Sequence, residues 1–271
     1  MHGLGNDFVV LDGRQTPVRF TGETASAIAN RRTGVGCDQI LILEPPRNGG
    51  DAFMAIRNSD GGQVQSCGNG TRAIAQVLFE ETGKDRLVIE TLAGPVTAWR
   101  AGDLIAVDMG PARTDWREIP LAQEKDTLHL MIGEGALQDP VAVNMGNPHA
   151  VFFVKDADAV DLAAVGPKLE HHPLFPERVN VEAVQVLNRE RLRMRVWERG
   201  AGITLACGTG ACASLVAAAR RGLADRSAVV TLDGGDLFIT WRDDGHVVMT
   251  GPAEESFRGT LDAHLAKGLV S

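Results

Sequence analysis

The sequence contains no tyrosine, and aromatic residues make up only 5% of its 271 positions. Proton chemistry would therefore fall to cysteine, histidine or carboxylate side chains. Only four cysteines occur, too few for the disulfide framework of a small secreted domain. No apolar run approaches the roughly 18 residues of a membrane-spanning helix. We therefore expect reduced thiols and no membrane partner.

Positive charge is also scarce, because 27 Lys and Arg residues face 35 Asp and Glu residues, a formal net charge of −8. Such a balance argues against a nucleic-acid partner. The first residues, MHGLGNDF, lack the charged and apolar regions of a signal peptide. Together with the reduced thiols, this predicts a cytoplasmic protein.

Glycine is abundant, at 31 residues, and part of it belongs to an internal repeat. At an offset of about 140 residues, CGNGTRA (67–73) falls on CGTGACA (207–213), and LGNDFVV (4–10) falls on MGNPHAV (145–151). The order of the matching segments is preserved, which indicates one ancestral half written twice. The expected domains are an N-terminal half, 1–113, and a C-terminal half, 114–257. In an alternative division, residues 258–271 also belong to the N-terminal half.

Most of each half has the pattern of short strands. Leu192, Met194 and Val196 alternate with arginines, as in a strand with one buried face. Runs such as DQILILE, RLVIET and DLFITW are short, rich in branched aliphatic residues and bounded by turn residues. Long helices do not alternate regularly with these strands. The pattern predicts an α+β fold of two mostly antiparallel sheet or barrel halves rather than a doubly wound parallel sheet.

One clear helix is expected in each half, beginning directly after Cys67 and Cys207. The second of these, containing ASLVAAARRG, is apolar almost all round and should be buried. Each half is therefore predicted to be a helix wrapped by strands. Weaker helical patterns occupy 23–32 and 161–170, and a Gly-Pro pair interrupts the second.

A thiol at the start of a helix lies beside backbone N–H groups and the positive end of the helix dipole, which lower its pKa and favour an anion. One such motif is weak, because cysteine is often simply buried. Two related motifs suit a two-base reaction, in which one thiolate removes a proton from a carbon and the other thiol protonates the opposite face. They could face each other across a pseudo-twofold cleft. The residues that would donate N–H groups to a carboxylate and to the developing charge are Gly68, Asn69, Gly208 and Thr209.

Seven segments, in the order HGLGNDFVVLD, GVGCDQILIL, NSDG, CGNGTR, NMGNPHAV, VNVE and ERGAGITLACGTGA, closely resemble diaminopimelate epimerase. They are spread over nearly the whole chain. The resemblance implies an epimerase that interconverts LL- and meso-2,6-diaminopimelate, in lysine and peptidoglycan-precursor biosynthesis, without pyridoxal phosphate. It also implies two similar halves, each a mostly antiparallel sheet around a central helix, with the active site in the cleft between them.

The resemblance implies that Cys67 and Cys207 are the acid/base pair. The substrate-binding residues that it implies are Asn6, Gln39, Asn58, Gly68, Asn69, Asn147, Asn180, Glu198, Arg199, Gly208 and Thr209, with His149 as an auxiliary candidate. Several are paired by the repeat: Asn6 with Asn147, Gln39 with Asn180, and Asn58 with Glu198. An ammonium group needs acceptors such as Asn58 and Glu198, whereas a remote carboxylate suits Arg199.

Each of these residues also has a purely structural interpretation. Asparagine is common in glycine-rich turns for backbone reasons alone. Glu198 and Arg199 could form a solvated pair, and Gln39 could face solvent. A structural hydrogen-bonding role explains His149 about as well as a role in the site.

The remaining cysteine and histidine residues suggest no second site. Cys37 and Cys212 lack the Cys-Gly-polar-Gly context and are expected to pack as small hydrophobic residues. His171 and His172 are adjacent, but they lack further Cys or His residues at the spacing of zinc ligands. No metal site is expected.

Two other functions compete with epimerisation of diaminopimelate. The first is a proline or hydroxyproline racemase, or another isomerase on the same duplicated fold, although a ring substrate would leave Arg199 unpaired at a cost of about 1–3 kcal/mol. The second is a thiol redox or non-catalytic amino-acid-binding protein. No C-x-x-C motif supports the redox form.

Three positions depart from the pattern of the resembling family. Ile203 stands where the family often has Glu, so a polar contact near Cys207 is expected to be missing or replaced. The chain begins at MHGLGNDF, where relatives usually have several more residues of strand, so a shorter or truncated first strand is expected. Phe257 replaces a Tyr that relatives often carry near a dimer contact. A homodimer is thus a further expectation.

Overall fold

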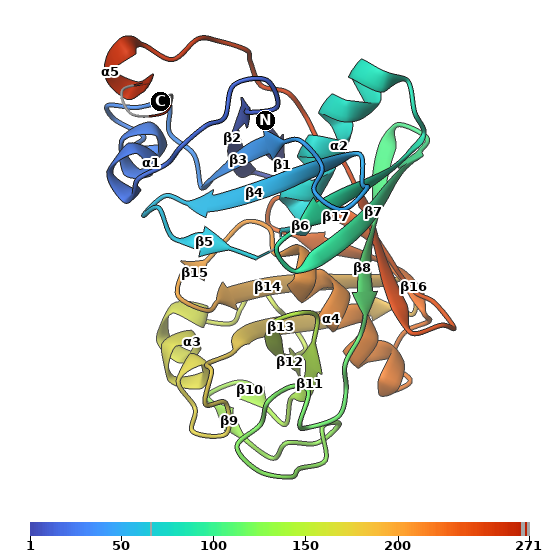
Figure 1. Ribbon diagram of the computed structural model, residues 1–271. Coiled ribbons are helices and arrows are strands. Elements are labelled where there is room, and N and C mark those ends of the chain that lie inside the picture. Colours follow the sequence, from blue (N-terminus) through green and yellow to red (C-terminus); the bar gives the residue numbers. More distant parts are fainter. Residues whose placement is uncertain (66, 267–268, 270–271) are drawn as a thin grey trace. The chain divides into compact units, whose positions relative to one another are not determined.

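The computed structural model describes residues 1–65, 67–266 and 269, and the chain forms two compact units (Figure 1). The first unit consists of Met1–Val107 and Gly251–Ser271, and the second of Asp108–Thr250. The chain passes from one unit to the other a few residues before each of the expected boundaries, 113–114 and 257–258. The C-terminal segment thus belongs to the N-terminal unit.

The first unit is built on a mixed sheet with strand order β1-β2-β3-β4-β6-β7-β8, and β5 is added to β4. The strands are β1 (His2–Gly3), β2 (Asn6–Asp12), β3 (Gln39–Glu44), β4 (Ala52–Asn58), β5 (Gln63–Val64), β6 (Arg86–Thr91), β7 (Gly94–Ala101) and β8 (Leu104–Pro111). The helices are α1 (Gly22–Ala29), α2 (Gly68–Thr82) and α5 (Ala263–Ala266). The pairs β2–β3 and β4–β6 are parallel, and the other neighbours in this order are antiparallel.

The second unit has the strand order β11-β12-β13-β14-β16-β17-β18, and β15 is added to β14. Its strands are β9 (Gly133–Glu134), β10 (Leu137–Gln138), β11 (Val141–Asn144), β12 (Pro148–Phe153), β13 (Asn180–Asn188), β14 (Arg191–Glu198), β15 (Gly202–Ile203), β16 (Ser227–Leu232), β17 (Gly235–Trp241) and β18 (His246–Gly251). Its helices are α3 (Leu162–Glu170) and α4 (Gly208–Arg220). Here β12–β13 and β14–β16 are the parallel pairs.

The two units repeat one topology, because β1 to β8 follow the same order and pairing as β11 to β18. The register agrees as well: Phe8 pairs with Gln39 between β2 and β3, and His149 pairs with Asn180 between β12 and β13. The predicted α+β fold with internal duplication is therefore confirmed. The matching register makes Phe8 the counterpart of His149, which becomes important for the site.

Helices α2 and α4 are the buried helices that the sequence predicted. Helix α2 buries Ile74, Leu78 and Phe79, and it ends at Gly83, whose φ of 67° is the left-handed conformation that glycine adopts at little cost. Helix α4 is buried on nearly all sides and packs against β11, β12, β13, β14, β16 and β17. Its many alanines leave little side-chain volume between the helix and the surrounding strands.

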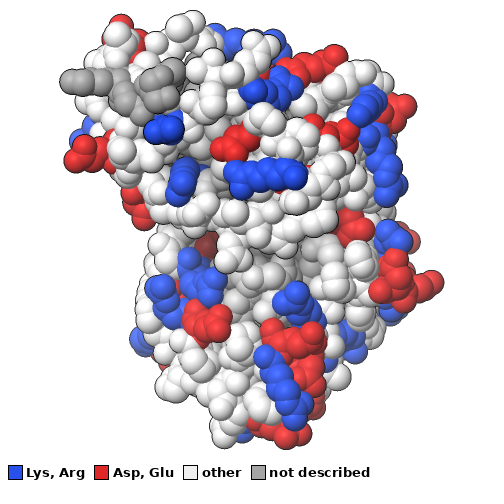
Figure 2. All heavy atoms as spheres, in the orientation of Figure 1, with Lys and Arg blue, Asp and Glu red and all other residues white. Residues whose placement is uncertain are grey.

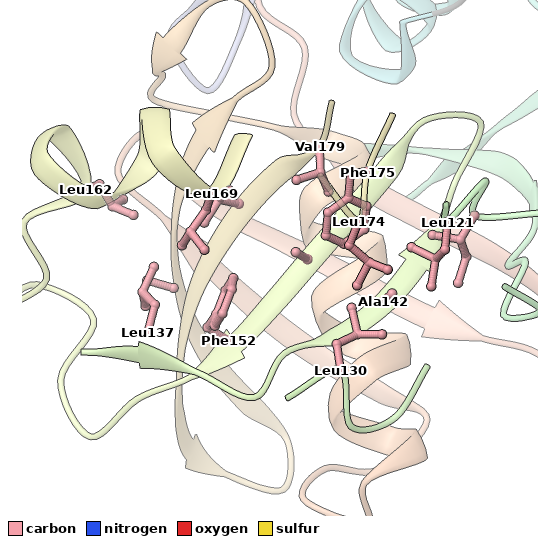
Figure 3. Packing of buried hydrophobic residues seen from close by; sticks show 14 of the residues in the cluster. Leu121, Leu130, Leu137, Ala142, Phe152, Leu162, Leu169, Leu174, Phe175 and Val179 are labelled. Atoms are coloured by element: carbon pink, nitrogen blue, oxygen red, sulfur yellow. The ribbon is translucent and has the colours of Figure 1, made fainter. Parts of the chain in front are cut away.

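The two weaker helical patterns also form helices, α1 and α3. Each begins with a side-chain cap, in which Thr21 or Asp161 accepts a hydrogen bond from the backbone N–H three residues later. Helix α3 tolerates an internal proline because its apolar face is buried: Leu162 and Leu169 lie in one hydrophobic cluster with Phe152 (Figure 3). The free energy gained by burying this face exceeds the cost of the backbone hydrogen bond that proline cannot make.

Acidic and basic side chains are interspersed on the face of the molecule shown in Figure 2. Across the protein, charged side chains form small ion-pair groups. In the first unit, Arg31 binds both Asp7 and Asp38 at 2.7 Å. This group fixes the start of β2 against the start of β3.

We expect Gly166→Ala to destabilise the protein. A Cβ at this position in α3 would lie 2.5 Å from the ring of Trp197 on β14. The resulting overpacking, of about 1–3 kcal/mol, exceeds the gain of up to about 1 kcal/mol from replacing glycine by alanine in a helix. Urea unfolding of the full chain should show a lower midpoint.

The matched control is Gly259→Ala, where an added Cβ meets no described atom within 4 Å. Its midpoint should stay at the wild-type value. Equal midpoints for both variants would contradict the close packing of α3 on Trp197.

Candidate active site

Cys67 occupies the N-cap position of α2. Its backbone is extended, and its Sγ accepts a hydrogen bond from the backbone N–H of Gly70 at 3.3 Å. This N–H lies in the first turn, where helical hydrogen bonds are missing, so the sulfur replaces the oxygen of a usual capping side chain. The side chain of Cys67 is half-buried. The sulfur of a half-buried cysteine is thus held at the positive end of a buried helix.

Cys207 occupies the equivalent position before α4, but its surroundings differ. Only 4% of the residue is exposed, and its Sγ lies 3.5 Å from the Thr209 hydroxyl. Burial raises the pKa of the Cys207 thiol well above its usual value, and the negative charges of Glu198 and Glu182 raise it further. The prediction of a lowered pKa is therefore wrong for Cys207, because loss of hydration outweighs the donors of the first turn. The raised pKa favours the protonated form of this sulfur at neutral pH.

Asn6 and Asn69 lie together in the first unit. The Asn69 amide donates to Oδ1 of Asn6 at 3.2 Å, and Arg72 donates to Oδ1 of Asn69 at 3.0 Å. The amide of Asn6 in turn donates to Asp38 at 3.0 Å. Two of the predicted binding residues are thus held by a chain of hydrogen bonds between a buried arginine and an exposed carboxylate.

Gln39 and Asn58 form a second polar pair in this unit. They are cross-strand partners of β3 and β4, and Nε2 of Gln39 donates to Oδ1 of Asn58 at 3.0 Å. Oε1 of Gln39 is buried and has no hydrogen-bond partner among the residues that the structure describes. A buried acceptor of this kind costs free energy unless a ligand donates to it.

Asn180 and Arg199 are linked in the second unit. Asn180 is 2% exposed, and its amide donates to the carbonyl of Pro148 at 2.9 Å, while its Oδ1 accepts from the backbone N–H of Arg199 at 2.9 Å. The guanidinium of Arg199 donates to the carbonyl of Glu177 at 2.8 Å. Asn180 therefore joins the start of β12 to the turn after β14.

Glu198 is the last residue of β14, directly before this turn, and its Oε1 accepts a hydrogen bond from the hydroxyl of Thr204. A buried carboxylate, Glu170, holds this turn by accepting from the Trp197 indole at 2.7 Å and the Gly200 N–H at 3.0 Å. Ile203, on β15, is 44% exposed. The position at which the resemblance implies Glu is thus occupied by an apolar side chain that is open to solvent.

His149 is fully buried on β12 and uses both ring nitrogens. Its Nε2 lies 3.0 Å from Oδ1 of Asn147, and its Nδ1 lies 2.6 Å from Oε1 of Glu182. The structural hydrogen-bonding role considered for His149 is therefore real. It also connects the residue to Asn147, one of the predicted binding residues.

Several polar residues that contact the predicted set escaped sequence reasoning, namely Asp38, Arg72, Glu182 and Thr204, and so did Glu170, which holds the turn that carries Arg199. The repeat contained a signal for one of them, because Glu182 corresponds to Leu41 in the other half. A carboxylate at a position where the matching half has leucine marks a polar group that the fold itself does not require.

The other two cysteines are core residues. Cys37 packs with Ala25, Ile28 and Ile40, and burial raises the pKa of its thiol to about 11. Cys212 is fully buried within α4.

Within the described part of the chain, no three His, Cys, Asp or Glu side chains are grouped as ligands of a metal ion. Among the described residues, none of the helices has the length and apolar character needed to cross a membrane.

The fold places the chain in a class of duplicated two-unit proteins with known structures. A predicted epimerase from Pseudomonas aeruginosa matches with a TM-score of 0.63 and 18% identity, over 91% of this chain and 90% of that one. A phenazine biosynthesis protein from Bacillus anthracis matches with a TM-score of 0.66 and 19% identity, over 93% and 91%. A probable proline racemase from Agrobacterium radiobacter matches with a TM-score of 0.64 and 17% identity, over 92% and 88%. At such identities these likenesses establish the fold alone.

The sequence determines the family within this class. A sequence model of diaminopimelate epimerase matches residues 1–114 and 141–255. The diaminopimelate epimerase of Rhodospirillum centenum is 57% identical over 99% of this chain and 93% of that protein. The enzyme of Phenylobacterium zucineum is 54% identical over 96% of both chains. The chain therefore belongs to the diaminopimelate epimerase family, and the resemblance seen in its sequence is confirmed.

The pKa of Cys207 predicts the pH dependence of its alkylation. Because the thiolate is the reactive form, a raised pKa lowers the reactive fraction at neutral pH. We expect carbamidomethylation of Cys207 by iodoacetamide to keep accelerating as the pH rises above about 9, because the ordinary pKa of a cysteine thiol is 9.0 and that of Cys207 is higher. Peptide mass spectrometry follows each cysteine separately.

The shape of the pH profile, rather than the absolute rate, is decisive, because burial alone slows the reagent equally at every pH. A rate for Cys207 that reaches its plateau below pH 8 would show that the thiol is ionised in the resting protein.

Proposed function

We propose that the chain interconverts LL- and meso-2,6-diaminopimelate by inverting one α-carbon, with no pyridoxal cofactor. The observation that carries the proposal is the matched pair of cysteines, each at the start of the buried helix of its own unit. A duplicated acid/base group suits an inversion, which needs one proton transfer on each face of a carbon. Membership of the diaminopimelate epimerase family supports this choice of substrate.

In the proposed reaction the thiolate of Cys67 takes the α-proton, so that an S–H bond forms as the C–H bond breaks. The thiol of Cys207 then gives its proton to the opposite face of the same carbon and becomes a thiolate. The raised pKa of Cys207 supports its role as the acid in the resting protein. In the reverse direction the two sulfur atoms exchange roles.

The charge that develops on the substrate needs hydrogen-bond donors. The first turns of α2 and α4 supply backbone N–H groups at the positive ends of two helices, which is where carboxylates bind in many proteins. Such donors stabilise the carbanion-like state without reorganisation. We therefore assign these N–H groups to the α-carboxylate of the reacting centre. The residues that carry them are Gly68, Asn69, Gly208 and Thr209.

The substrate has a second amino-acid group, which needs acceptors for its ammonium and donors for its carboxylate. The buried Oε1 of Gln39 supports an ammonium site beside Asn58, because it lacks a donor within the described residues. Arg199 is the proposed partner of the remote carboxylate, with Glu198 as an acceptor beside it. Further binding residues in the proposal are Asn6, Asn147 and Asn180.

The proposal extends to the location and assembly of the enzyme. We assign it to the cytoplasm, where free cysteines stay reduced. We also propose a homodimer, which the exposed aromatic side chain of Phe257, 67% accessible, supports as a contact residue.

Two substitutions test the reaction. Cys67→Ala and Cys207→Ala should each lower the rate of LL-diaminopimelate epimerisation by at least about 10³-fold, since each removes one of the two proton-transfer groups. The conversion of the LL to the meso isomer is followed by chromatography. Cys37→Ala is the matched control and should retain activity, because Cys37 belongs to the core around α1.

Proline is the comparison substrate and should not be racemised by the wild-type chain. Full turnover of diaminopimelate by either Cys67→Ala or Cys207→Ala would eliminate the two-thiol reaction. Turnover of proline in place of diaminopimelate would eliminate the proposed substrate.

A further inference from the structure

A fully buried carboxylate, Glu182 on β13, lies against the first turn of α4. A Cβ added to Gly210 would come within 3.0 Å of Oε1 of Glu182 and within 3.3 Å of Sγ of Cys207. Oε1 lies 2.6 Å from Nδ1 of His149. The other oxygen, Oε2, makes no hydrogen bond to any residue that the structure describes. A buried, half-satisfied carboxylate therefore lies beside the proposed acid, which is a costly arrangement.

The first unit shows that the fold does not need this carboxylate. Leu41 is the counterpart of Glu182, and its Cδ2 lies 3.0 Å from a Cβ added to Gly70 in the first turn of α2. Phe8 is the counterpart of His149 in the register of the parallel pair. Two apolar side chains thus fill the place of the polar pair in the other unit. The cost of burying the polar pair points to a functional role rather than to packing.

His149 extends this arrangement to Asn147. Nε2 of the imidazole lies 3.0 Å from Oδ1 of Asn147, and because an amide oxygen only accepts, this contact is a hydrogen bond in the tautomer in which Nε2 carries a hydrogen. The amide oxygen is then turned toward the imidazole, and the NH₂ group is turned away from it. The orientation of Asn147 therefore depends on which nitrogen of His149 is protonated, and that depends on the partner of Nδ1.

We propose that Glu182 is a positioning residue that holds one proton together with His149 and thereby keeps the NH₂ group of Asn147 directed at a carboxylate of the substrate. The inference rests on the proposed function only for the identity of that substrate. Glu182 does not touch the reacting atoms in this arrangement. It acts through His149, which in turn fixes Asn147.

The proton balance of the pair gives the physical reason. A protonated Glu182 with a neutral imidazole and an ionised Glu182 with an imidazolium contain the same number of protons, and in both Nε2 carries a hydrogen. Removing one proton leaves an ionised carboxylate accepting from Nδ1–H, and Nε2 becomes an acceptor. Asn147 would then have to turn and present its oxygen, which repels a carboxylate. Loss of that single proton therefore weakens substrate binding.

The surroundings of Glu182 favour retention of the proton. Burial raises the pKa of Glu182, and the negative charge of Glu198 on β14 raises it further, while His149 on β12 opposes both effects. The remaining titratable neighbour is Cys207 at the start of α4, which is neutral when it carries its proton. We therefore expect the pair to lose its proton on the alkaline side.

Two substitutions separate the held proton from simple packing. Glu182→Gln keeps the shape and can donate an N–H to Nδ1, but it cannot titrate. Its KM at neutral pH should stay within about 3-fold of wild type, and the alkaline rise of KM that belongs to Glu182 should disappear. Glu182→Leu copies the residue of the first unit and leaves Nδ1 without a partner. Its KM should rise about 10-fold or more, with kcat changed less than about 3-fold.

Thr127→Val is the matched control. Thr127 is a buried polar residue whose hydroxyl accepts from Arg220 at the far end of α4, about 18 Å along the helix from its first residue. Its KM and pH profile should match those of the wild type. An unchanged KM in Glu182→Leu, or an alkaline limb that persists in Glu182→Gln, would overturn the inference.

A measurement on the unliganded protein separates this inference from the proposed function. The ¹⁵N resonances of the His149 imidazole, assigned by comparison with His149→Gln, should shift on the alkaline side in the wild-type chain and show no such step in Glu182→Gln. Identical titrations in the two proteins would overturn the inference whether or not diaminopimelate is turned over. If diaminopimelate is not turned over but the His149 resonances titrate as expected in both proteins, the proposed function is refuted and this inference is not.

Discussion

The placement of a sulfur atom at the first turn of a buried helix is the constraint on which the rest of the structure depends. The N–H of Gly70 reaches Sγ of Cys67 because the first turn of a helix has donors without helical partners. Such a turn is useful only if the helix is fixed, and the strands around α2 and α4 provide this by burying both helices. Glycine at 70 and 210 keeps the turn close to Leu41 and Glu182, respectively.

The duplication places a cysteine directly before the buried helix of each unit, but the contacts of the two sulfur atoms differ: Cys67 accepts from the N–H of Gly70, whereas Cys207 contacts the Thr209 hydroxyl. In the first unit, Asn6 is held by Asn69 and Asp38, through direct amide hydrogen bonds. In the second unit the counterpart, Asn147, is held by the buried pair of His149 and Glu182. The backbone is therefore repeated while the chemistry is not, which is what an asymmetric substrate with one reacting centre requires.

The sequence repeat was enough to predict two helix-and-sheet halves, because strand order and helix position follow from local patterns that occur twice. The pKa of Cys207 could not be predicted, since it depends first on the burial of the thiol by the surrounding strands and then on the carboxylates of Glu198 and Glu182, which β14 and β13 bring to the start of α4. Glu182 was missed for a related reason: β13 is buried on both faces from Asn180 to Val184, so no alternation separates a buried glutamate from an exposed one. Helix α3 was ambiguous because its internal proline is compensated by long-range packing.

The distribution of solvent deuterium early in the reaction tests the central claim, that two thiols act on opposite faces of one carbon. The wild-type chain is mixed with LL-diaminopimelate in deuterated water, and the α-positions are followed by NMR before equilibrium is reached. Two thiols predict that the meso product carries deuterium at the inverted carbon, while the remaining LL isomer stays protiated, because each sulfur serves one face only. Equal deuterium in recovered LL isomer and product from the start would contradict the claim.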